Sequence, residues 1–283
     1  MAIKTVGVLG CGLMGAGIAQ VSAAAGFKVI VREVNQGVLD KGLGRIKKFL
    51  DDGVAKGKVT EEQRTTTLGN LSGATEFAEM KDCDLIIEAI IENIDDKAAA
   101  YTALEKSVGA HCIFVSNTSS LCITELASKT QRPDKFGGLH FFNPVPLMKL
   151  VEVVRGLSTS NDTYDALMDF SVKIGKEPIT APDKPGFIVN RLLIPYLLDA
   201  IRCYEHGLGT KEDIDKAMKL GLGYPMGPLT LLDFVGLDTT YYIANIMFDE
   251  FKDPMFAAPT LLKRMVLAGK NGRKSGEGFY KYS

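Results

Sequence analysis

The amino-acid sequence predicts an α/β protein in which a mostly parallel sheet domain is followed by a smaller, all-helical domain. In the first part of the chain, short apolar runs typical of buried strands alternate with amphipathic helical segments, the pattern of a parallel sheet covered by helices. A proline-punctuated segment, residues 178–185, interrupts this pattern and is typical of a hinge. Beyond it the chain turns helical. We therefore expect one domain over residues 1–183 and a second over residues 184–283.

The composition is that of an ordinary globular protein. The 283 residues are 46% hydrophobic and 24% charged, enough for two domains with sizeable cores. A formal net charge of −1 gives no sign of a nucleic-acid or membrane-surface partner. The five cysteines have no CxxC spacing, so we expect reduced thiols and no metal site. The chain starts directly in a strand and holds no apolar run of about 18 residues, so we expect a cytoplasmic protein.

A glycine-rich turn follows the first strand. Residues 3–9 are expected to form a short buried strand, and Gly10-Cys-Gly12-Leu13-Met14-Gly15 then opens a helix. A second strand, 27–31, follows that helix, which gives the βαβ context of a dinucleotide fingerprint. Gly10 would permit the tight turn, Gly12 the approach of a pyrophosphate, and Gly15 the close packing of helix on strand. The sequence therefore predicts a Rossmann-type domain. The alternative is that the glycines serve only a tight turn.

Glu33 ends the second strand and sets the expected choice of dinucleotide. Its carboxylate would accept hydrogen bonds from ribose hydroxyls and repel a 2′-phosphate, which favours NAD over NADP. The neighbouring Arg32 would favour such a phosphate, so the strictness of this choice stays open.

The next part of the chain is a long helical excursion over residues 36–67, which includes a capping-box sequence at Thr60–Gln63. It is longer than a minimal crossover and so suggests a contact with a second ligand. The sheet is expected to resume at 71–74 and again at 84–91, the latter a near-continuous apolar run. Glu88, Glu92 and Lys97 lie at or beyond the carboxyl end of the latter strand, where ligands of open α/β sheets bind. Spacing alone fits equally well an exposed Glu92–Lys97 pair on a helix rim.

Asn117-Thr-Ser119-Ser120 follows the strand 112–116. These small polar residues could cap the helix that begins near Ile123 or bind a polar group of a substrate. The strand 135–142 is expected to end at the same edge of the sheet, so Ser119 and His140 could face one pocket.

His140 is the strongest candidate for acid–base chemistry. It lies in an apolar stretch and is followed twelve residues later by Glu152. The intervening Asn143-Pro-Val-Pro146 would break the strand and could return Glu152 to the imidazole. A carboxylate on one ring nitrogen fixes the tautomer and stabilises the imidazolium. The alternative is a hydrogen-bonded core histidine.

The other two histidines carry less information. We expect His206 to end a helix as a favourable cation. His111 precedes a strand and shows no pattern that indicates a partner.

The second domain begins with a long apolar helix, expected over residues 187–206, with Pro195 as a kink. Further helices are expected at 211–220, from Leu229, and over 238–251. Their apolar faces would pack against a second copy of the chain or against one another. Asn190 lies near the start of the first helix, next to the hinge, where it could reach a substrate cleft.

Motifs along essentially the whole chain resemble the short-chain L-3-hydroxyacyl-CoA dehydrogenase family, in particular its bacterial 3-hydroxybutyryl-CoA members. They are Val6–Gln20, Ile86–Asn93, Ser116–Leu121, Gly137–Val154, Asp183–Leu193 and Gly223–Asp238, with GEGFYKY near the C-terminus. The resemblance implies a two-domain homodimer. It further implies oxidation of the 3-hydroxyl of an L-3-hydroxyacyl-CoA with NAD, or the reverse reaction on acetoacetyl-CoA.

The resemblance also implies roles for residues. His140 would be the base, Glu152 its partner, and Ser119 and Asn190 would hydrogen-bond the reacting oxygen. Lys56 would reach the phosphates of coenzyme A. The residues that would contact the cofactor are Gly10, Gly12, Leu13, Met14, Gly15, Glu33, Glu92, Lys97, Asn143 and Lys274. Relatives often carry Asp at the position of Glu33, and the longer carboxylate should still reach the ribose.

Two rival functions remain open at this point. Dehydrogenases of free small hydroxy acids share the domain order, but they usually place a catalytic lysine on the interdomain helix, where this chain has Asn190. A non-catalytic binding or structural relative would be expected to have lost His140, Glu152 or a loop glycine, and all are present.

Overall fold

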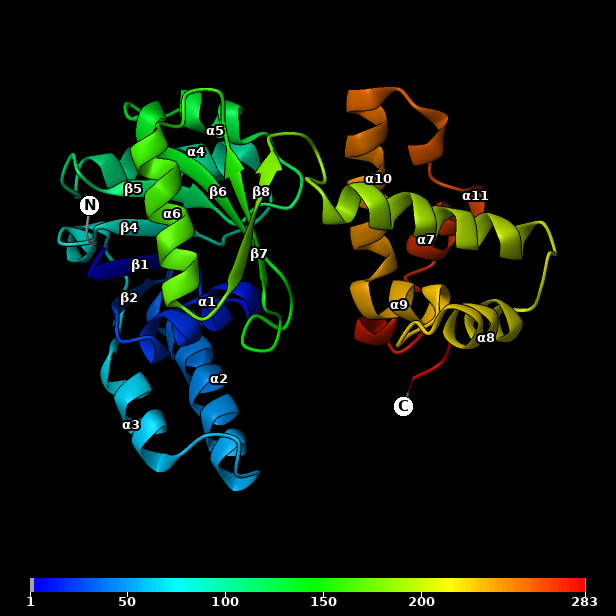
Figure 1. Ribbon diagram of the computed structural model, residues 1–283, viewed down its shortest axis with the longest axis horizontal. Coiled ribbons are helices and arrows are strands. Elements are labelled where there is room, and N and C mark those ends of the chain that lie inside the picture. The colour runs from blue at the N-terminus through cyan, green and yellow to red at the C-terminus, as the bar shows by residue number, and fades with distance from the viewer. Residues whose placement is uncertain (1–2, 283) are drawn as a thin grey trace. The chain divides into compact units, whose positions relative to one another are not determined.

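A computed structural model describes residues 3–282 of the chain. The chain divides into two compact units, Met1–Asp183 and Lys184–Ser283, and Figure 1 gives the labels of their elements. The first unit holds the sheet and the second is helical.

Within the described residues the first unit contains one eight-stranded sheet, with strand order β3-β2-β1-β4-β5-β6-β7-β8. All neighbouring strands are parallel except β6 and β7, which are antiparallel. The predicted mostly parallel sheet is therefore confirmed. The strands are β1 (Thr5–Leu9), β2 (Lys28–Arg32), β3 (Leu71–Ala74), β4 (Leu85–Glu88), β5 (Ile113–Ser116), β6 (Phe136–Phe141), β7 (Leu150–Arg155) and β8 (Glu177–Pro182).

Helices cover both faces of the sheet, because its strands are apolar on both sides. The helices are α1 (Leu13–Ala24), α2 (Gln36–Ala55), α3 (Glu61–Gly69), α4 (Ile94–Glu105), α5 (Ile123–Ser128) and α6 (Asn161–Lys173). One core joins the sheet to α1, α2 and α6, the last of which runs along β6 to β8 (Figure 1). The predicted capping box of α3 is present, with Thr60 and Gln63 exchanging hydrogen bonds of 2.9 and 3.1 Å.

The alternation of side chains along β6 decides which way His140 points. Leu139 and Phe141 belong to the core shared with α1 and α6, so the residues between them face the other side of the sheet. On that side the ring of Phe136 packs edge-to-face against Tyr101 of α4, with 4.9 Å between the ring centroids. His140 therefore faces the side that α4 and α5 cover.

The proline-punctuated hinge predicted over 178–185 is wrong over most of its length. Residues 177–182 form β8, the edge strand of the sheet. Prolines are tolerated there because an edge strand leaves one row of N–H groups without a ladder partner. The chain leaves the sheet only at Asp183, whose carboxylate accepts hydrogen bonds from the backbone N–H groups of Ile123 (2.8 Å) and Thr124 (2.7 Å).

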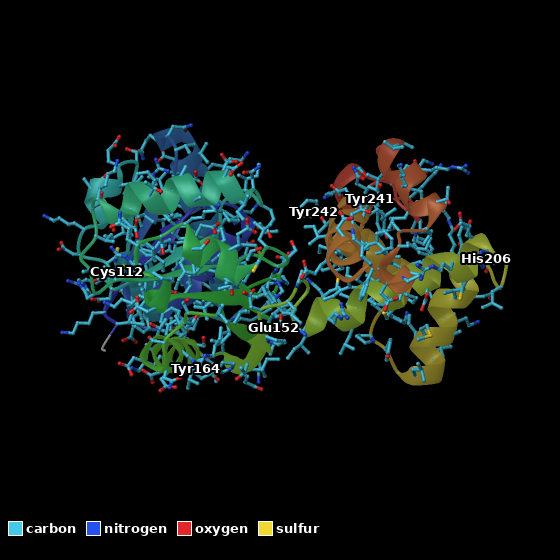
Figure 2. All side chains as sticks on the ribbon, turned by 90° about the horizontal axis from the view of Figure 1, so that it is seen from above. Cys112, Glu152, Tyr164, His206, Tyr241 and Tyr242 are labelled. Carbon is cyan, nitrogen blue, oxygen red and sulfur yellow. The ribbon has the colours of Figure 1, made fainter. Side chains whose placement is uncertain are left out.

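The second unit is a cluster of helices around an apolar core that includes Leu197, Leu229 and Met247. The sequence missed the last helix. The helices are α7 (Val189–Glu205), α8 (Lys211–Leu222), α9 (Pro228–Val235), α10 (Leu237–Phe251) and α11 (Thr260–Leu267). His206 caps the C-terminal end of α7, as predicted (Figure 2). None of the helices within residues 3–282 combines the length and apolar content needed to cross a bilayer.

Candidate active site

The pairing of β6 with β7 brings His140 and Glu152 together. The two residues lie directly opposite each other in the antiparallel ladder, so their side chains share one face of the sheet. His140 Nδ1 lies 2.6 Å from Glu152 Oε2. The relative exposure is 6% for His140 and 0% for Glu152. The predicted return of the carboxylate to the imidazole is therefore confirmed. With Nδ1 held by a carboxylate, Nε2 is the ring nitrogen suited to exchange a proton.

Neighbouring groups hold this pair in place. The ring of Phe142 lies 4.5 Å from that of His140. The backbone N–H of Phe141 donates a 3.0 Å hydrogen bond to Asn117 Oδ1. Asn117 therefore fastens the end of β6 to the end of β5 and does not cap the following helix. Because β5 and β6 are parallel neighbours, the half-buried Ser119 and His140 lie at the same edge of the sheet.

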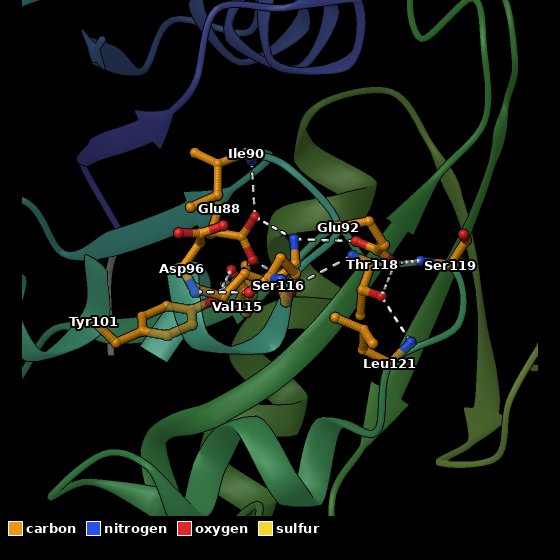
Figure 3. A network of polar contacts seen from close by, with 12 residues as sticks. Glu88, Ile90, Glu92, Asp96, Tyr101, Val115, Ser116, Thr118, Ser119 and Leu121 are labelled. Carbon is orange, nitrogen blue, oxygen red and sulfur yellow. Dashed lines mark hydrogen bonds and ion pairs between the residues drawn. The ribbon is translucent and has the colours of Figure 1, made fainter. Parts of the chain in front are cut away.

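A buried polar network occupies the adjacent carboxyl end of β4 (Figure 3). Glu88 is fully buried, and its Oε1 accepts from Lys97 Nζ at 2.6 Å and from the N–H of Ile90 at 2.8 Å. Its Oε2 accepts from Ser116 Oγ at 2.7 Å. Burial and the nearby carboxylate raise the pKa of Tyr101 well above its ordinary value, so its phenol remains a donor beside Glu88.

Lys97 links this network to the loop that carries Ser119. Its ammonium makes a second ion pair with Glu92 Oε2 at 3.1 Å, and its side chain is 1% exposed. Glu92 Oε1 in turn accepts from the hydroxyl of Thr118 and from the N–H of Ser119, the latter at 3.3 Å. The interpretation of Glu92 and Lys97 as an exposed pair on a helix rim is therefore wrong for Lys97. Burying the charges of Glu88, Glu92 and Lys97 would be costly if they had no partners. In this network the Lys97 ammonium pairs with both carboxylates.

Two glycines of the motif, Gly10 and Gly15, are required by the protein's own backbone geometry and packing, whereas Gly12 is not. Gly10 has φ +88, and a Cβ on Gly15 would lie 1.9 Å from the carbonyl oxygen of Gly10. A turn and a close helix–strand contact explain these two glycines, as predicted. By contrast, a Cβ on Gly12 would meet no protein atom within 4 Å. The missing side chain there leaves open space in front of the N-terminus of α1, which fits a bound pyrophosphate.

Glu33 lies beside this turn and holds it. The N–H of Cys11 donates to Glu33 Oε1 at 2.6 Å, and the N–H of Val34 donates to Oε2 at 3.1 Å. The Nε of Arg32 donates to the carbonyl oxygen of Thr75 at 3.0 Å. A pocket of about 610 Å³ opens here. The residues that line it include Gly10, Gly12, Arg32, Glu33, Phe77 and Asp96.

The remaining candidate residues lie in several places. Asn143 is exposed at the turn after β6, and Lys56 is exposed at the C-terminal end of α2. In the second unit, Asn190 lies in the first turn of α7, and Lys274 Nζ forms an ion pair with Asp238 Oδ1 at 2.7 Å. Among residues 3–282, no three His, Cys, Asp or Glu side chains are grouped to hold a metal ion.

The sequence around His111 shows no pattern that indicates a partner. In the structure its Nε2 lies 3.4 Å from Asp84 Oδ1. The two residues precede the neighbouring strands β4 and β5, a proximity that depends on strand order and that the local sequence does not reveal.

Comparison with known proteins assigns the chain to a family. The model of the 3-hydroxyacyl-CoA dehydrogenase NAD binding domain matches residues 5–184, and that of the 3-hydroxyacyl-CoA dehydrogenase C-terminal domain matches residues 186–282. The chain belongs to the 3-hydroxyacyl-CoA dehydrogenase family. The predicted family and the predicted cofactor, NAD, are therefore confirmed. The open space in front of Gly12 fits the pyrophosphate of NAD, and the Glu33 carboxylate fits its ribose.

Individual members are similar over nearly the whole of this chain and over at least nine-tenths of their own length. The mitochondrial hydroxyacyl-coenzyme A dehydrogenase of Sus scrofa is 50% identical over 288 residues, covering 99% of this chain and 91% of the relative. A 3-hydroxybutyryl-CoA dehydrogenase of Mycobacterium tuberculosis is 47% identical and 99% of each chain is covered. The crystal structure of (S)-3-hydroxybutyryl-CoA dehydrogenase PaaH1 from Ralstonia eutropha has a TM-score of 0.96 at 43% identity, covering all of both chains. The chain is thus an NAD-dependent dehydrogenase.

Proposed function

We propose that this dehydrogenase interconverts L-3-hydroxybutyryl-CoA and acetoacetyl-CoA, with His140 as the general base and acid. The observation that carries the proposal is the buried contact of 2.6 Å between His140 Nδ1 and Glu152 Oε2. The family supports the reaction class, and the names of the similar bacterial proteins support a four-carbon acyl group.

In the oxidation, His140 Nε2 takes the proton of the 3-hydroxyl group. NAD bound at the glycine motif supplies the acceptor for the hydride that leaves C3. Glu152 stabilises the imidazolium and holds the ring in one orientation. Ser119 Oγ and the amide of Asn190 hydrogen-bond the reacting oxygen. In the reduction, the imidazolium returns the proton to the ketone oxygen. Positioned acid–base catalysis of this kind contributes about 10² to 10⁴-fold.

The first unit is proposed to hold the cofactor. Gly10, Gly12 and Gly15, with Leu13 and Met14, surround the pyrophosphate, and Glu33 accepts hydrogen bonds from the ribose. Arg32 is proposed to line the pocket without binding a 2′-phosphate, because its guanidinium lies 4.1 Å above the Phe77 ring. A preference for NAD over NADP follows from this arrangement.

Other contacts extend the proposed site. Glu92 and Asn143 contact the cofactor, and the buried Lys97 acts on it through Glu92, which it holds. Lys274 is proposed as a further cofactor contact, and Lys56 as a contact to the phosphates of coenzyme A.

The second unit is proposed to mediate homodimerisation and to complete the substrate cleft. Its helices expose large apolar side chains, among them Leu192 (71%), Leu220 (75%) and Leu222 (62%). Such side chains are commonly covered in an oligomer. Light scattering at micromolar concentration would give twice the chain mass if this is correct and the chain mass if it is not. The free cysteines suit the proposed reducing, cytoplasmic location.

The test of the proposed reaction is the absorbance of NADH at 340 nm with acetoacetyl-CoA as substrate. We expect NADH to be consumed with the CoA ester and not with free acetoacetate. Equal consumption with the free acid would favour a dehydrogenase of small hydroxy acids. NADH binding without turnover on any substrate would indicate a non-catalytic relative. Acyl chains of four to ten carbons in the same assay define the length preference.

A further inference from the structure

Lys176 is a buried cation that the mechanism above does not use. It lies between α6 and β8, is 7% exposed, and its ammonium donates to the carbonyl oxygens of Val145 (2.5 Å) and Met148 (2.7 Å). Within residues 3–282 it has no carboxylate within ion-pair distance. Burial lowers its pKa. Burying an ammonium without an opposite charge costs free energy. If the residue at this position served packing alone, an apolar side chain would therefore suit it better.

Both carbonyls belong to one segment, residues 142–149, which we call the β6–β7 loop. The same loop is held from its other side by α1. Val145 is 2% exposed, and a Cβ on Gly17 of α1 would lie 2.8 Å from Val145 Cβ. Inside the loop, the carbonyl oxygen of Pro144 accepts from the N–H groups of Leu147 and Met148, both at 3.0 Å. The loop is thus a closed turn between α1 and the Lys176 ammonium.

In the β6–β7 loop, Asn143 lies beside the N-terminal part of α1, the helix that follows the glycine motif. Asn143 is exposed and lines a small hollow together with Leu13 and Ala16 of α1. Leu13 directly follows Gly12, where the open space for the pyrophosphate lies. The position of Asn143 relative to the cofactor therefore depends on how the loop is held.

We propose that Lys176 is a positioning residue of the dehydrogenase, which holds the β6–β7 loop so that Asn143 contacts the cofactor. This inference rests on the cofactor contact proposed for Asn143. The His140–Glu152 pair is set by the ladder between β6 and β7, so Lys176 acts on cofactor binding and leaves proton transfer largely unchanged.

The test replaces Lys176 by Met, which keeps the length of the side chain and removes its donors. The Kd for NADH is measured by its fluorescence, and kcat is measured at saturating NADH. Hydrogen bonds from charged groups are worth enough that the Kd should rise on the order of tenfold, while kcat should change less than about threefold. Lys176→Arg should recover much of the binding. The control is Lys173→Met, at the last residue of α6 and three residues before Lys176. Lys173 is exposed and paired with Asp169 at 2.6 Å, so this variant should bind NADH normally.

The same substitution in an Asn143→Ala background separates positioning from general stability. If Lys176 acts through Asn143, Lys176→Met should weaken NADH binding in the wild-type background and add less than about twofold in the Asn143→Ala background. An equal effect in both backgrounds, or a lower Tm with an unchanged Kd, overturns the proposal. Asn143→Ala with normal NADH binding instead refutes the contact proposed for Asn143. If Lys176→Met does not fold, Lys176→Gln gives the same comparison.

Discussion

Glu152→Gln is the change that isolates the contribution of the buried carboxylate. Glutamine keeps the size of the side chain and an oxygen that can still accept from His140 Nδ1, so the β6–β7 ladder should be preserved. The change removes a charge-assisted hydrogen bond of 2.6 Å between His140 Nδ1 and Glu152, whose side chain is fully buried. Hydrogen bonds to charged groups contribute about 1.5–3 kcal/mol, and this bond is strongest when the imidazolium forms. We therefore expect kcat to fall roughly 10- to 100-fold.

The assay is NADH consumption with acetoacetyl-CoA, together with the Kd for NADH and the Tm of the variant. The Kd should stay the same, because Glu152 lies on β7 and the dinucleotide turn follows β1. In a His140→Gln background the loss of Glu152 should cost little more, since the two side chains act as a unit. A kcat within twofold of wild type, or a full additional loss in the His140→Gln background, would refute this reasoning.

Three further predictions follow from the network, the glycine turn and a buried thiol. Lys97→Met leaves two carboxylates short of their shared cation, so unfolding in urea should show a stability loss of about 3–5 kcal/mol; a loss below about 1 kcal/mol would contradict the network. Gly12→Ala should keep the Tm and weaken NADH binding on the order of tenfold. Gly15→Ala should instead lower the free energy of unfolding by about 3 kcal/mol or more. Similar effects of the two changes would contradict the assignment of Gly12 to the cofactor and of Gly15 to helix–strand packing. Burial, with a contribution from a nearby carboxylate, raises the pKa of Cys11 to about 11; because little thiolate exists at pH 8, iodoacetamide should leave Cys11 unmodified there and label it only once the protein unfolds.

The features that the sequence predicts well are those whose physical cause is local. The glycine turn before α1 and the acidic Glu33 lie within one βαβ unit, so spacing alone places them. His140 and Glu152 are separated by a short proline-broken segment, which makes an antiparallel return the natural solution. The capping box at Thr60 needs only residues three apart.

Apart from the helix α11 of the second unit, the features that it misses depend on how the strands of the sheet are assembled. The prolines of β8 are compatible with a strand only because β8 is the edge of the sheet, a fact that no local pattern contains. Glu88 looks like the polar end of an apolar strand, but its partners Lys97 and Ser116 come from positions 9 and 28 residues away. Lys176 meets carbonyl oxygens about 30 residues earlier in the chain. These contacts exist only after the sheet has assembled.

The most direct test of the acid–base account is the turnover of His140→Gln with acetoacetyl-CoA, compared with its affinity for NADH. The account predicts that kcat falls by about 10² to 10⁴-fold while the Kd for NADH stays within about twofold and the Tm is little changed. Turnover at the wild-type rate would show that the imidazole held by Glu152 is not the group that moves the proton.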